Sequence, residues 1–311
     1  MSAYYRIMLG RKSCFAEECF EGGFIGADFG IHEDLSGNLP DQWKQFNKQF
    51  IPIFLKNSPG KSRISAGLAC GALWTISKGI QIGDVILSPN GQGSYRVGRV
   101  AGDYYYAPGG NLPQRRKIDW IDHQVPRSSM SDDLRHATGS IGTVSTVSQY
   151  GPEIESLIQG RMANVVQPAP LQVSPLEDAR TFAMEKHLEE FLVHNWKQTE
   201  LGGEYDIYTD EDGNPGQQFP SDTWPIDILA VSKDKKRLLV VELKKGRASD
   251  AVVGQIARYM GYVRDELAEE GQEVEGVIIA LDDDLRVKRA LSSIPGVSFW
   301  RYQVNFKLLK G

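Results

Sequence analysis

Cysteine is scarce in this sequence, which holds only Cys14, Cys19 and Cys70 among its 311 residues. A sparse and odd number of cysteines builds no disulfide framework, and such usage is typical of a protein kept in a reducing compartment. A zinc site is not indicated either, because only Cys14 and Cys19 are close in sequence and no histidine pair lies near them.

Long apolar segments are also missing. No run approaches the roughly 18 residues that a membrane span needs, and the opening residues MSAYYRIMLGRKS lack the apolar centre of a signal peptide. We therefore expect a cytoplasmic protein with no membrane partner.

A large excess of charge of one sign is absent as well. The formal net charge is −5, so nucleic-acid binding cannot be inferred from bulk charge. An acidic nuclease is compatible with this balance, because carboxylates that hold metal ions add to the negative count while a local basic rim meets the phosphates.

The length of the chain exceeds the usual domain size of about 100 to 200 residues, which favours two domains. Between residues 160 and 177 the segment GRMANVVQPAPLQVSPLE has three prolines and little periodicity, as expected of an extended linker. We predict a first domain at residues 1–160, a linker at 161–176 and a second domain at 177–311.

The two halves differ in their predicted elements. In the first half, the pattern predicts helices near 41–51 and 64–79, followed by short strands such as GDVILS and SYRVGRVAGDYYY. This order predicts a small, strongly bent β-barrel with helices attached. The second half alternates helices with strands near YDIYT, PIDILAV, RLLVVELK and VEGVIIAL, and it ends in strands near SFWRYQV and NFKLL. This order predicts a mixed sheet flanked by helices, so the whole chain belongs to the α/β (α+β) class.

Two acidic residues are predicted to face each other in the second half. Folding the chain back at residues 234–235 pairs Val231 with Leu238, and the same register sets Asp227 opposite Glu242. Directly opposed side chains of an antiparallel pair lie about 4.5 to 5.5 Å apart at Cβ. Period two places Lys244 on the same face as Glu242.

Two carboxylates this close repel each other, and a divalent cation relieves the repulsion while a neighbouring ammonium group tempers it. The pattern therefore indicates a site for a metal ion and an attacking water. The alternative is a set of solvated salt bridges, which the same residue types form at many hairpins.

A third acid lies on a predicted helix. In TFAMEKHLEEFLVHNW the apolar stripe runs through Leu188, Leu192 and Trp196, and Glu185 falls on this stripe. A carboxylate that faces a core needs a reason, and a shared metal site would be one. A rim acid paired with Lys or Arg is the alternative, and Glu189 at the edge of the stripe is the second choice.

The next helix, which Ser249 and Asp250 open as N-cap residues, carries Gln255 beside Tyr259 of its apolar stripe. An amide there would hold the nucleophilic water or a phosphate, although a plain surface glutamine is equally consistent. Basic residues around this helix are candidates for contact with a DNA backbone, or for a solvated charged face. They are Lys245, Arg247, Arg258 and Arg264.

Together, Glu185, Asp227, the triplet Glu242-Leu243-Lys244 and Gln255 match the PD-(D/E)xK nuclease pattern. More closely, the segments EKHLEEFLVHNW, PIDILAV, VVELKKGRASDAVVGQIARYMGYV and VEGVIIA resemble, in the same order, the nuclease domain of the NucS (EndoMS) family. The resemblance covers residues 177–308. It implies a restriction-endonuclease-like core that hydrolyses DNA phosphodiesters with Mg²⁺ or Mn²⁺.

By motif position, the resemblance implies that Asp227, Glu242 and the backbone carbonyl of Leu243 bind the metal. Lys244 would polarise water or steady the phosphate, Glu185 and Gln255 would assist, and Tyr259 would contact DNA together with the basic residues. The chain departs from the family at Trp224, where a small residue is expected before the proline, and in its first half. Mismatch-specific cutting is therefore not carried over.

In the first half, the Gly-Asp-Val opening of one strand, the Val-Gly-x-Val of the next and the aromatics after it resemble PUA-like barrels of the EVE type, which read modified bases. The aromatic residues expected to stack on a flipped base are Trp74, Tyr104, Tyr106 and Trp120. Barrel core is the alternative for these aromatics. Arg115 and Arg116 are candidates for phosphate contact, or for a solvated loop.

The resulting hypothesis is a two-domain, Mg²⁺- or Mn²⁺-dependent DNA endonuclease whose N-terminal barrel senses a modified base, as in a modification-dependent restriction enzyme. A homodimer is expected. The alternatives are a repair nuclease that cuts mismatched or branched DNA, and a DNA-binding protein that uses a nuclease core without catalysis.

Overall fold

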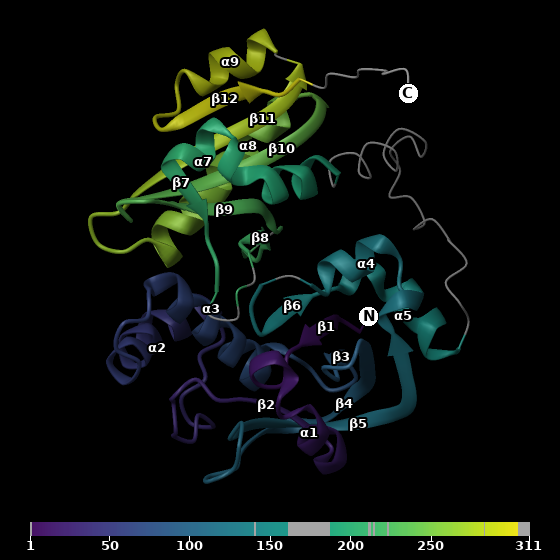
Figure 1. Cartoon of the computed structure of the whole chain (residues 1–311). Coiled ribbons are helices and arrows are strands. Elements are labelled where there is room, and N and C mark those ends of the chain that lie inside the picture. Colours follow the sequence, from purple (N-terminus) through teal and green to yellow (C-terminus); the bar gives the residue numbers. More distant parts are fainter. Residues whose placement is uncertain are drawn as a thin grey trace. The chain divides into compact units, whose positions relative to one another are not determined.

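The computed structural model describes residues 2–139, 141–160, 187–210, 213, 215–222, 224–282 and 284–303. The chain divides into two compact units (Figure 1). Unit 1 comprises Met1–Ala169 with Asp210–Asn214, and unit 2 comprises Pro170–Thr209 with Pro215–Gly311. The predicted linker and the last predicted strand, near NFKLL, lie outside the described residues.

Unit 1 contains one mixed sheet with the strand order β2-β5-β4-β3-β1-β6 in the described part of the chain. Strand β1 runs parallel to β3, whereas the other neighbouring pairs are antiparallel. The strands are β1 (Tyr4–Ile7), β2 (Phe24–Ala27), β3 (Val85–Pro89), β4 (Ser94–Tyr106), β5 (Gln114–Pro126) and β6 (Val144–Thr146).

The long hairpin of β4 and β5 gives this sheet its bend. The strands have 13 residues each, and their pairing shifts register between Arg96 and Gly98 and again between Val100 and Tyr104. Extra residues of this kind kink the bulged strand and increase its twist. The predicted strand at SYRVGRVAGDYYY coincides with β4.

The helices of unit 1 pack on this sheet and beside it. Helix α3 begins at the N-cap Ser62, whose hydroxyl accepts a hydrogen bond from the Ser65 amide. The helices are α1 (Ala16–Gly22), α2 (Trp43–Asn57), α3 (Arg63–Trp74), α4 (Asp132–Ala137) and α5 (Gly151–Ile158), with short turns η1 (Arg11–Ser13), η2 (Thr75–Gly79), η3 (Arg127–Ser129) and η4 (Ser148–Tyr150).

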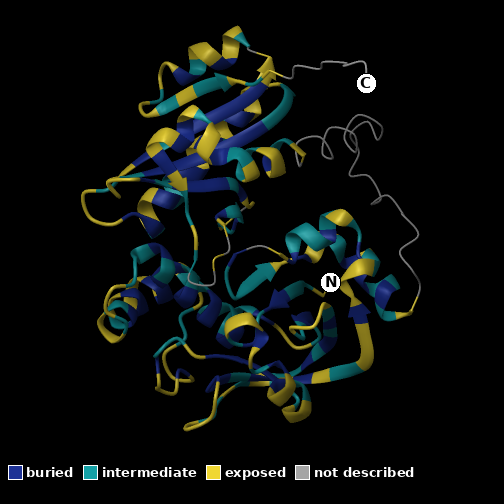
Figure 2. Ribbon diagram, in the orientation of Figure 1, coloured by how far each residue is buried: buried dark blue, intermediate teal, exposed yellow. Residues whose placement is uncertain are grey.

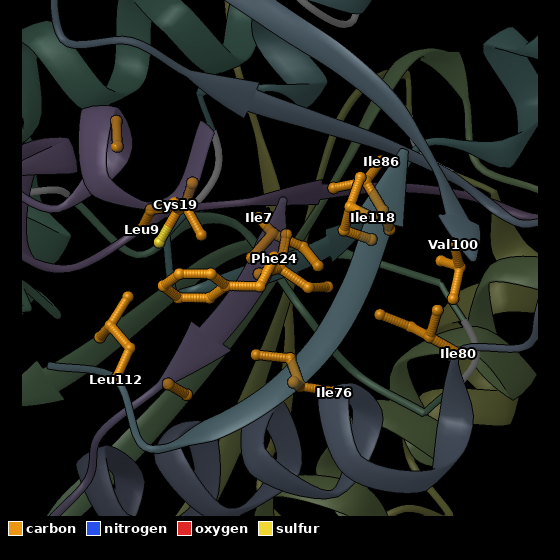
Figure 3. Packing of buried hydrophobic residues seen from close by; sticks show 13 residues of the cluster. Ile7, Leu9, Cys19, Phe24, Ile76, Ile80, Ile86, Val100, Leu112 and Ile118 are labelled. Atoms are coloured by element: carbon orange, nitrogen blue, oxygen red, sulfur yellow. The ribbon is translucent and has the colours of Figure 1, made fainter. Parts of the chain in front are cut away.

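Alternating residues of the strands supply the core of unit 1. Figure 3 shows Ile7 of β1, Ile86 of β3, Val100 of β4 and Ile118 of β5 meeting Ile76 of η2 in one cluster. Each of these five side chains is at most 2% exposed. Unit 1 therefore has a hydrophobic core of its own.

Unit 2 is built on a second mixed sheet. In its described residues the order is β12-β11-β10-β9-β7, and β8 also pairs with β9. Strands β10, β11 and β12 are parallel, while β9 runs antiparallel to β10. The strands are β7 (Tyr205–Ile207), β8 (Gln217–Phe219), β9 (Ile226–Ser232), β10 (Arg237–Arg247), β11 (Glu273–Asp282) and β12 (Val297–Arg301). The predicted α+β class is confirmed, and the structure shows two mixed sheets in the described residues.

Helices of unit 2 pack against the inner strands β10 and β11. Figure 2 shows these two strands as mostly buried. The helix at residues 187–195 contributes Leu188 and Leu192 of the predicted apolar stripe to a cluster with Trp196 and Val241 of β10. The other elements are η5 (Trp196–Gln198), α7 (Glu200–Glu204), α8 (Asp250–Tyr262), η6 (Val263–Leu267) and α9 (Leu285–Leu291). No described helix in either unit is both long enough and apolar enough to cross a membrane.

Because unit 2 buries its own core, a fragment of residues 173–311 is expected to fold by itself. Circular dichroism should show a mixed helix and strand spectrum, and heating should give one cooperative unfolding transition. A fragment of residues 1–160 is the matched counterpart. Aggregation of both fragments would contradict the predicted boundary.

Candidate active site on the second sheet

The register of β9 and β10 brings Asp227 to Glu242. The observed pairs run from Leu238↔Val231 to Val241↔Ile228, which is the predicted register, and Asp227 and Glu242 occupy the next position. Beyond the last of these pairs, the Leu243 amide donates to the Asp227 side chain, whose Oδ2 accepts this hydrogen bond over 2.7 Å. The side chain of Asp227 is thereby held against β10.

Glu242 and Lys244 form an ion pair beside Asp227. Glu242 is 1% exposed, and its Oε1 accepts a hydrogen bond of 2.7 Å from Lys244 Nζ, which is 27% exposed at the side chain. A buried carboxylate is costly unless it is paired. Lys244 supplies that pairing and still reaches solvent.

Burial, together with nearby negative charges, raises the pKa of Asp227 well above its usual range. The largest cause is burial, followed by the negative charges of Glu242 and Glu189, and the Leu243 amide and Lys244 oppose the shift. Three carboxylates and the ammonium group of Lys244 thus interact electrostatically at this position. Their repulsion is what a bound cation would relieve.

Glu189 is the acid of the preceding helix that the structure brings to the site. It is 5% exposed, and its Oε2 accepts a hydrogen bond of 2.6 Å from Gln218 Nε2. Glu185, the first choice from the sequence, lies outside the described residues.

The sequence-based prediction missed Gln218. Strand β8 pairs Gln217 with Ile228 and Phe219 with Ile226, so Gln218 lies across from Asp227. Its Nε2 lies 3.4 Å from Asp227 Oδ1. The signal in the sequence is a second antiparallel hairpin in which the chain before β9 folds back onto it. A strand of three residues is too short to recognise from periodicity.

Tyr259 of helix α8 is hydrogen-bonded to Pro225, the residue that precedes β9. The Gln255 amide donates to the Tyr259 hydroxyl over 3.1 Å, and that hydroxyl donates to the Pro225 carbonyl over 3.0 Å. Burial, together with the charges of Glu242 and Asp227, raises the pKa of Tyr259 to about 12, although the Gln255 hydrogen bond opposes the shift. Gln255 thus reaches the site region through Tyr259.

The structure contradicts the expectation that Tyr259 contacts DNA. Its side chain is 1% exposed, and its hydroxyl is used inside unit 2. The physical reason is that the apolar stripe of α8 buries the ring against the sheet, and a buried phenol finds an internal hydrogen-bond acceptor.

The predicted basic residues of unit 2 differ in their availability. Arg247 forms an ion pair of 2.6 Å with Asp284, which offsets its charge. Arg258 and Arg264 are exposed on α8 and η6, and Lys245 is partly exposed after Lys244 on β10. Arg258 and Lys245 remain proposed phosphate contacts.

The donor set fits a cation held by two carboxylates. In the described part of the chain, no three side chains of His, Cys, Asp or Glu gather closely enough to hold a metal ion by themselves. Mg²⁺, however, usually keeps several waters and binds one or two carboxylates together with substrate phosphates. Asp227 and Glu242 would hold it, and the Leu243 carbonyl is a proposed further ligand.

In unit 1 the structure contradicts the expectation that Arg116 contacts DNA. Its side chain is 5% exposed and donates to the Ile76 carbonyl over 2.7 Å and to the Ser77 carbonyl over 3.0 Å. Burial lowers the pKa of its guanidinium. The carbonyls at the end of η2 need donors, and Arg116 provides them from the adjacent strand.

Arg115 is also engaged within unit 1. Its guanidinium donates to the carbonyls of Leu112 and Asn111 over 3.0 and 2.6 Å and lies 3.8 Å from the centre of the Phe24 ring. Glu18 lies 3.6 Å away, and the Arg115 side chain is 14% exposed. These contacts favour a structural role over phosphate binding.

Alanine at Arg116 is therefore expected to lower the free energy of unfolding by about 2 to 4 kcal/mol, because carbonyl groups lose their donors inside the core. DNA affinity should stay unchanged. Urea unfolding and DNA titration of the full chain measure the two effects. Lys117→Ala, at the exposed neighbouring position, is the control that should leave stability within about 0.5 kcal/mol. An Arg116→Ala protein of normal stability with weakened DNA binding would restore the original assignment.

The predicted aromatic residues do not line a common cage. Tyr104 lies across from Arg116 and Trp120 lies across from Gly98, so the two aromatics are about four residues, or roughly 13 Å, apart along β5. Aromatic contacts span about 4.5 to 7 Å. Trp74 and Tyr104 pack on one core cluster and Trp120 on another.

Polar atoms of these aromatics are used internally. The Trp74 and Trp120 indoles donate to the carbonyls of Pro40 and Cys19, and the Tyr104 hydroxyl donates to Gln114. The contacts of these three rings agree with the core alternative. Tyr106 is partly exposed on β4, and its role in base recognition stays a prediction.

A family model described as a domain of unknown function, DUF8426, matches residues 5–147. No curated protein matches the chain. Among solved structures, the chain is similar to an EndoMS complex with double-stranded DNA, at 15% identity over 72% of this chain and 66% of that chain with a TM-score of 0.32. The chain is also similar to a repair endonuclease from Pyrococcus abyssi, at 15% identity over 69% of this chain and 66% of that chain with a TM-score of 0.30.

The MspJI restriction endonuclease in complex with a 27-mer oligonucleotide gives 13% identity over 78% of this chain and 60% of that chain, with a TM-score of 0.22. The chain spans about two thirds or less of each of these matched chains. Similarity at this level assigns neither a fold nor a function, so any functional assignment depends on the geometry of the site.

Proposed function

We propose that the protein is a metal-dependent DNA endonuclease that hydrolyses phosphodiester bonds with Mg²⁺ or Mn²⁺. The observation that supports this proposal best is the arrangement of Asp227, Glu242 and Lys244, in which two opposed carboxylates and an ammonium group lie together at one end of the paired strands β9 and β10. Perturbed carboxylates with a specific charge partner are typical of functional sites.

Each side chain has a distinct task in this proposal. Asp227 and Glu242 hold the cation, which when bound makes a coordinated water more acidic and neutralises charge on the phosphate. The Leu243 amide keeps Asp227 in place. Lys244 stabilises negative charge that develops on the phosphate, because its Nζ is partly exposed next to Glu242.

The direct test is nicking of supercoiled plasmid DNA by the full chain with Mg²⁺, Mn²⁺, Ca²⁺ or EDTA. Nicking that requires Mg²⁺ or Mn²⁺ supports the proposal. DNA binding without cutting in any cation would favour the alternative of a non-catalytic DNA-binding protein.

For substrate choice, we propose a modification-dependent restriction enzyme in which unit 1 selects the DNA. Matched duplexes that are unmodified, cytosine-modified or mismatched decide this point. Preference for the modified duplex supports the proposal, whereas preference for the mismatched or a branched duplex identifies a repair nuclease. Light scattering of the same preparation measures whether the protein is the expected homodimer.

A further inference from the structure

We propose that Gln218 is a positioning residue of the cation site, through which Glu189 acts on Asp227 without binding the cation itself. The inference rests on the proposed function, since it concerns the same pair of carboxylates. It assigns a task to a residue outside the nuclease sequence pattern.

The amide of Gln218 bridges two acids. Its Nε2 lies 2.6 Å from Glu189 Oε2 and 3.4 Å from Asp227 Oδ1. Ionised carboxylates only accept hydrogen bonds, so the group that faces both must be the NH₂ end of the amide, with one hydrogen for each acid. An NH₂ group donates and offers no lone pair to a metal.

This donor completes the fixation of Asp227. Oδ2 already accepts a hydrogen bond from the Leu243 amide at 2.7 Å, so with Gln218 on Oδ1 both oxygens are held and the plane of the carboxylate is set. Glu189 in turn orients the amide of Gln218 from the helix at 187–195. Partners behind a ligand commonly set its orientation and tune the metal in this way.

The backbone of Gln218 gives independent support. Its φ angle is +47°, although both neighbours pair with β9 as ordinary strand residues. Residues other than glycine rarely adopt a positive φ, because the conformation is strained. Backbone strain of this kind persists where the surrounding structure enforces it, often at functional sites. The conformation places the amide between the two acids.

The position of the amide also explains why Glu189 is not a direct ligand. Because the NH₂ group lies between Glu189 and Asp227, the gap between these two acids is filled by a donor. The cation then binds on the side of Asp227 that faces Glu242. This agrees with the finding that, among the described residues, no three acidic, histidine or cysteine side chains converge on one point.

Calorimetric titration of the full chain with Mn²⁺ in the absence of DNA tests the proposal. Gln218→Leu is expected to weaken Mn²⁺ binding by about 10- to 100-fold. Gln217→Leu is the matched control on the neighbouring position and should bind as the wild type does. Equal affinity of Gln218→Leu and wild type would overturn the proposal.

Gln218→Gly separates positioning from structural support. Glycine adopts a positive φ without strain, so the unfolding midpoint should not fall, while Mn²⁺ binding should weaken as it does for Gln218→Leu. A fall in midpoint with unchanged affinity would show that Gln218 serves only the fold.

Gln218→Glu distinguishes a donor from a ligand. At pH 8 a carboxylate here is expected to repel both acids and to weaken Mn²⁺ binding, whereas tighter binding would place the cation between Glu189 and Asp227 and overturn the proposal. If the wild-type protein nicks DNA and the Gln218→Leu variant binds Mn²⁺ with wild-type affinity, only the role of Gln218 is refuted. Wild-type protein that neither binds Mn²⁺ nor cuts DNA refutes the proposed function and this inference together.

Discussion

Alanine at Asp227 or at Glu242 is expected to reduce plasmid nicking by about 1000-fold or more, since a cation that supplies several kcal/mol of transition-state stabilisation loses one of two anionic ligands. Both side chains are held in place before any cation binds, by the Leu243 amide and by Lys244 respectively. Each loss therefore removes a prepared ligand. Single-turnover cleavage of a labelled duplex in Mg²⁺ measures the effect, with DNA binding determined in parallel.

Asparagine at Asp227 is the control against unfolding. The pKa of Asp227 is raised in the folded chain, so its ionised form opposes folding at pH values above the folded pKa, and this cost disappears as pH falls below the unfolded value. Without divalent cations at neutral pH, Asp227→Asn should therefore have a higher unfolding midpoint than the wild type.

A protein that is more stable and yet inactive would identify Asp227 as part of the site and not of the scaffold. Full cleavage by both the Asp227→Ala and Glu242→Ala variants would place the active site elsewhere in the chain.

Lys244→Ala is expected to lower turnover by about 100- to 1000-fold with little change in Kd for DNA, because a preorganised charge stabilises the transition state more than the bound substrate. Its Nζ lies 2.7 Å from Glu242 Oε1, so it would lie near a phosphate bound to the cation that Asp227 and Glu242 are proposed to hold. Turnover at saturating DNA and Kd measured in Ca²⁺ separate the two effects.

Lys245→Ala is the neighbouring comparison. As a proposed phosphate contact, Lys245 should affect affinity and its salt dependence and leave turnover near normal. If Lys244→Ala weakens binding and spares turnover, Lys244 is a phosphate anchor and not a participant in the chemistry.

Local periodicity explains why part of the site could be predicted from the sequence. A tight turn at 234–235 and period-two strands leave one register that buries the apolar residues, and this register brings Asp227 next to Glu242. The boundaries of β4 and the N-cap of α8 at Ser249 follow equally from nearby residues. No long-range information is needed for any of these features.

The role of a charged or aromatic side chain is less accessible to such reasoning. The run Arg115-Arg116-Lys117 has the composition of a phosphate-binding patch, but Arg116 is buried because η2, some 40 residues earlier in the chain, presents carbonyls to it. Alternation along the strand predicts Tyr104 and Tyr106 on one face, as a cage with Trp120 would require, yet the pairing of β4 with β5 separates Tyr104 from Trp120.

The sequence by itself determined the α+β class, the hairpin of β9 and β10 and the opposed pair Asp227 and Glu242, because alternation and turn chemistry act between residues that are close in the chain. Only the tertiary structure decided that Gln218 bridges Glu189 and Asp227, and that Arg116 and Tyr259 are internal. These contacts join segments whose approach depends on how whole elements pack, and packing buries a polar side chain wherever a distant segment offers it a hydrogen-bond partner.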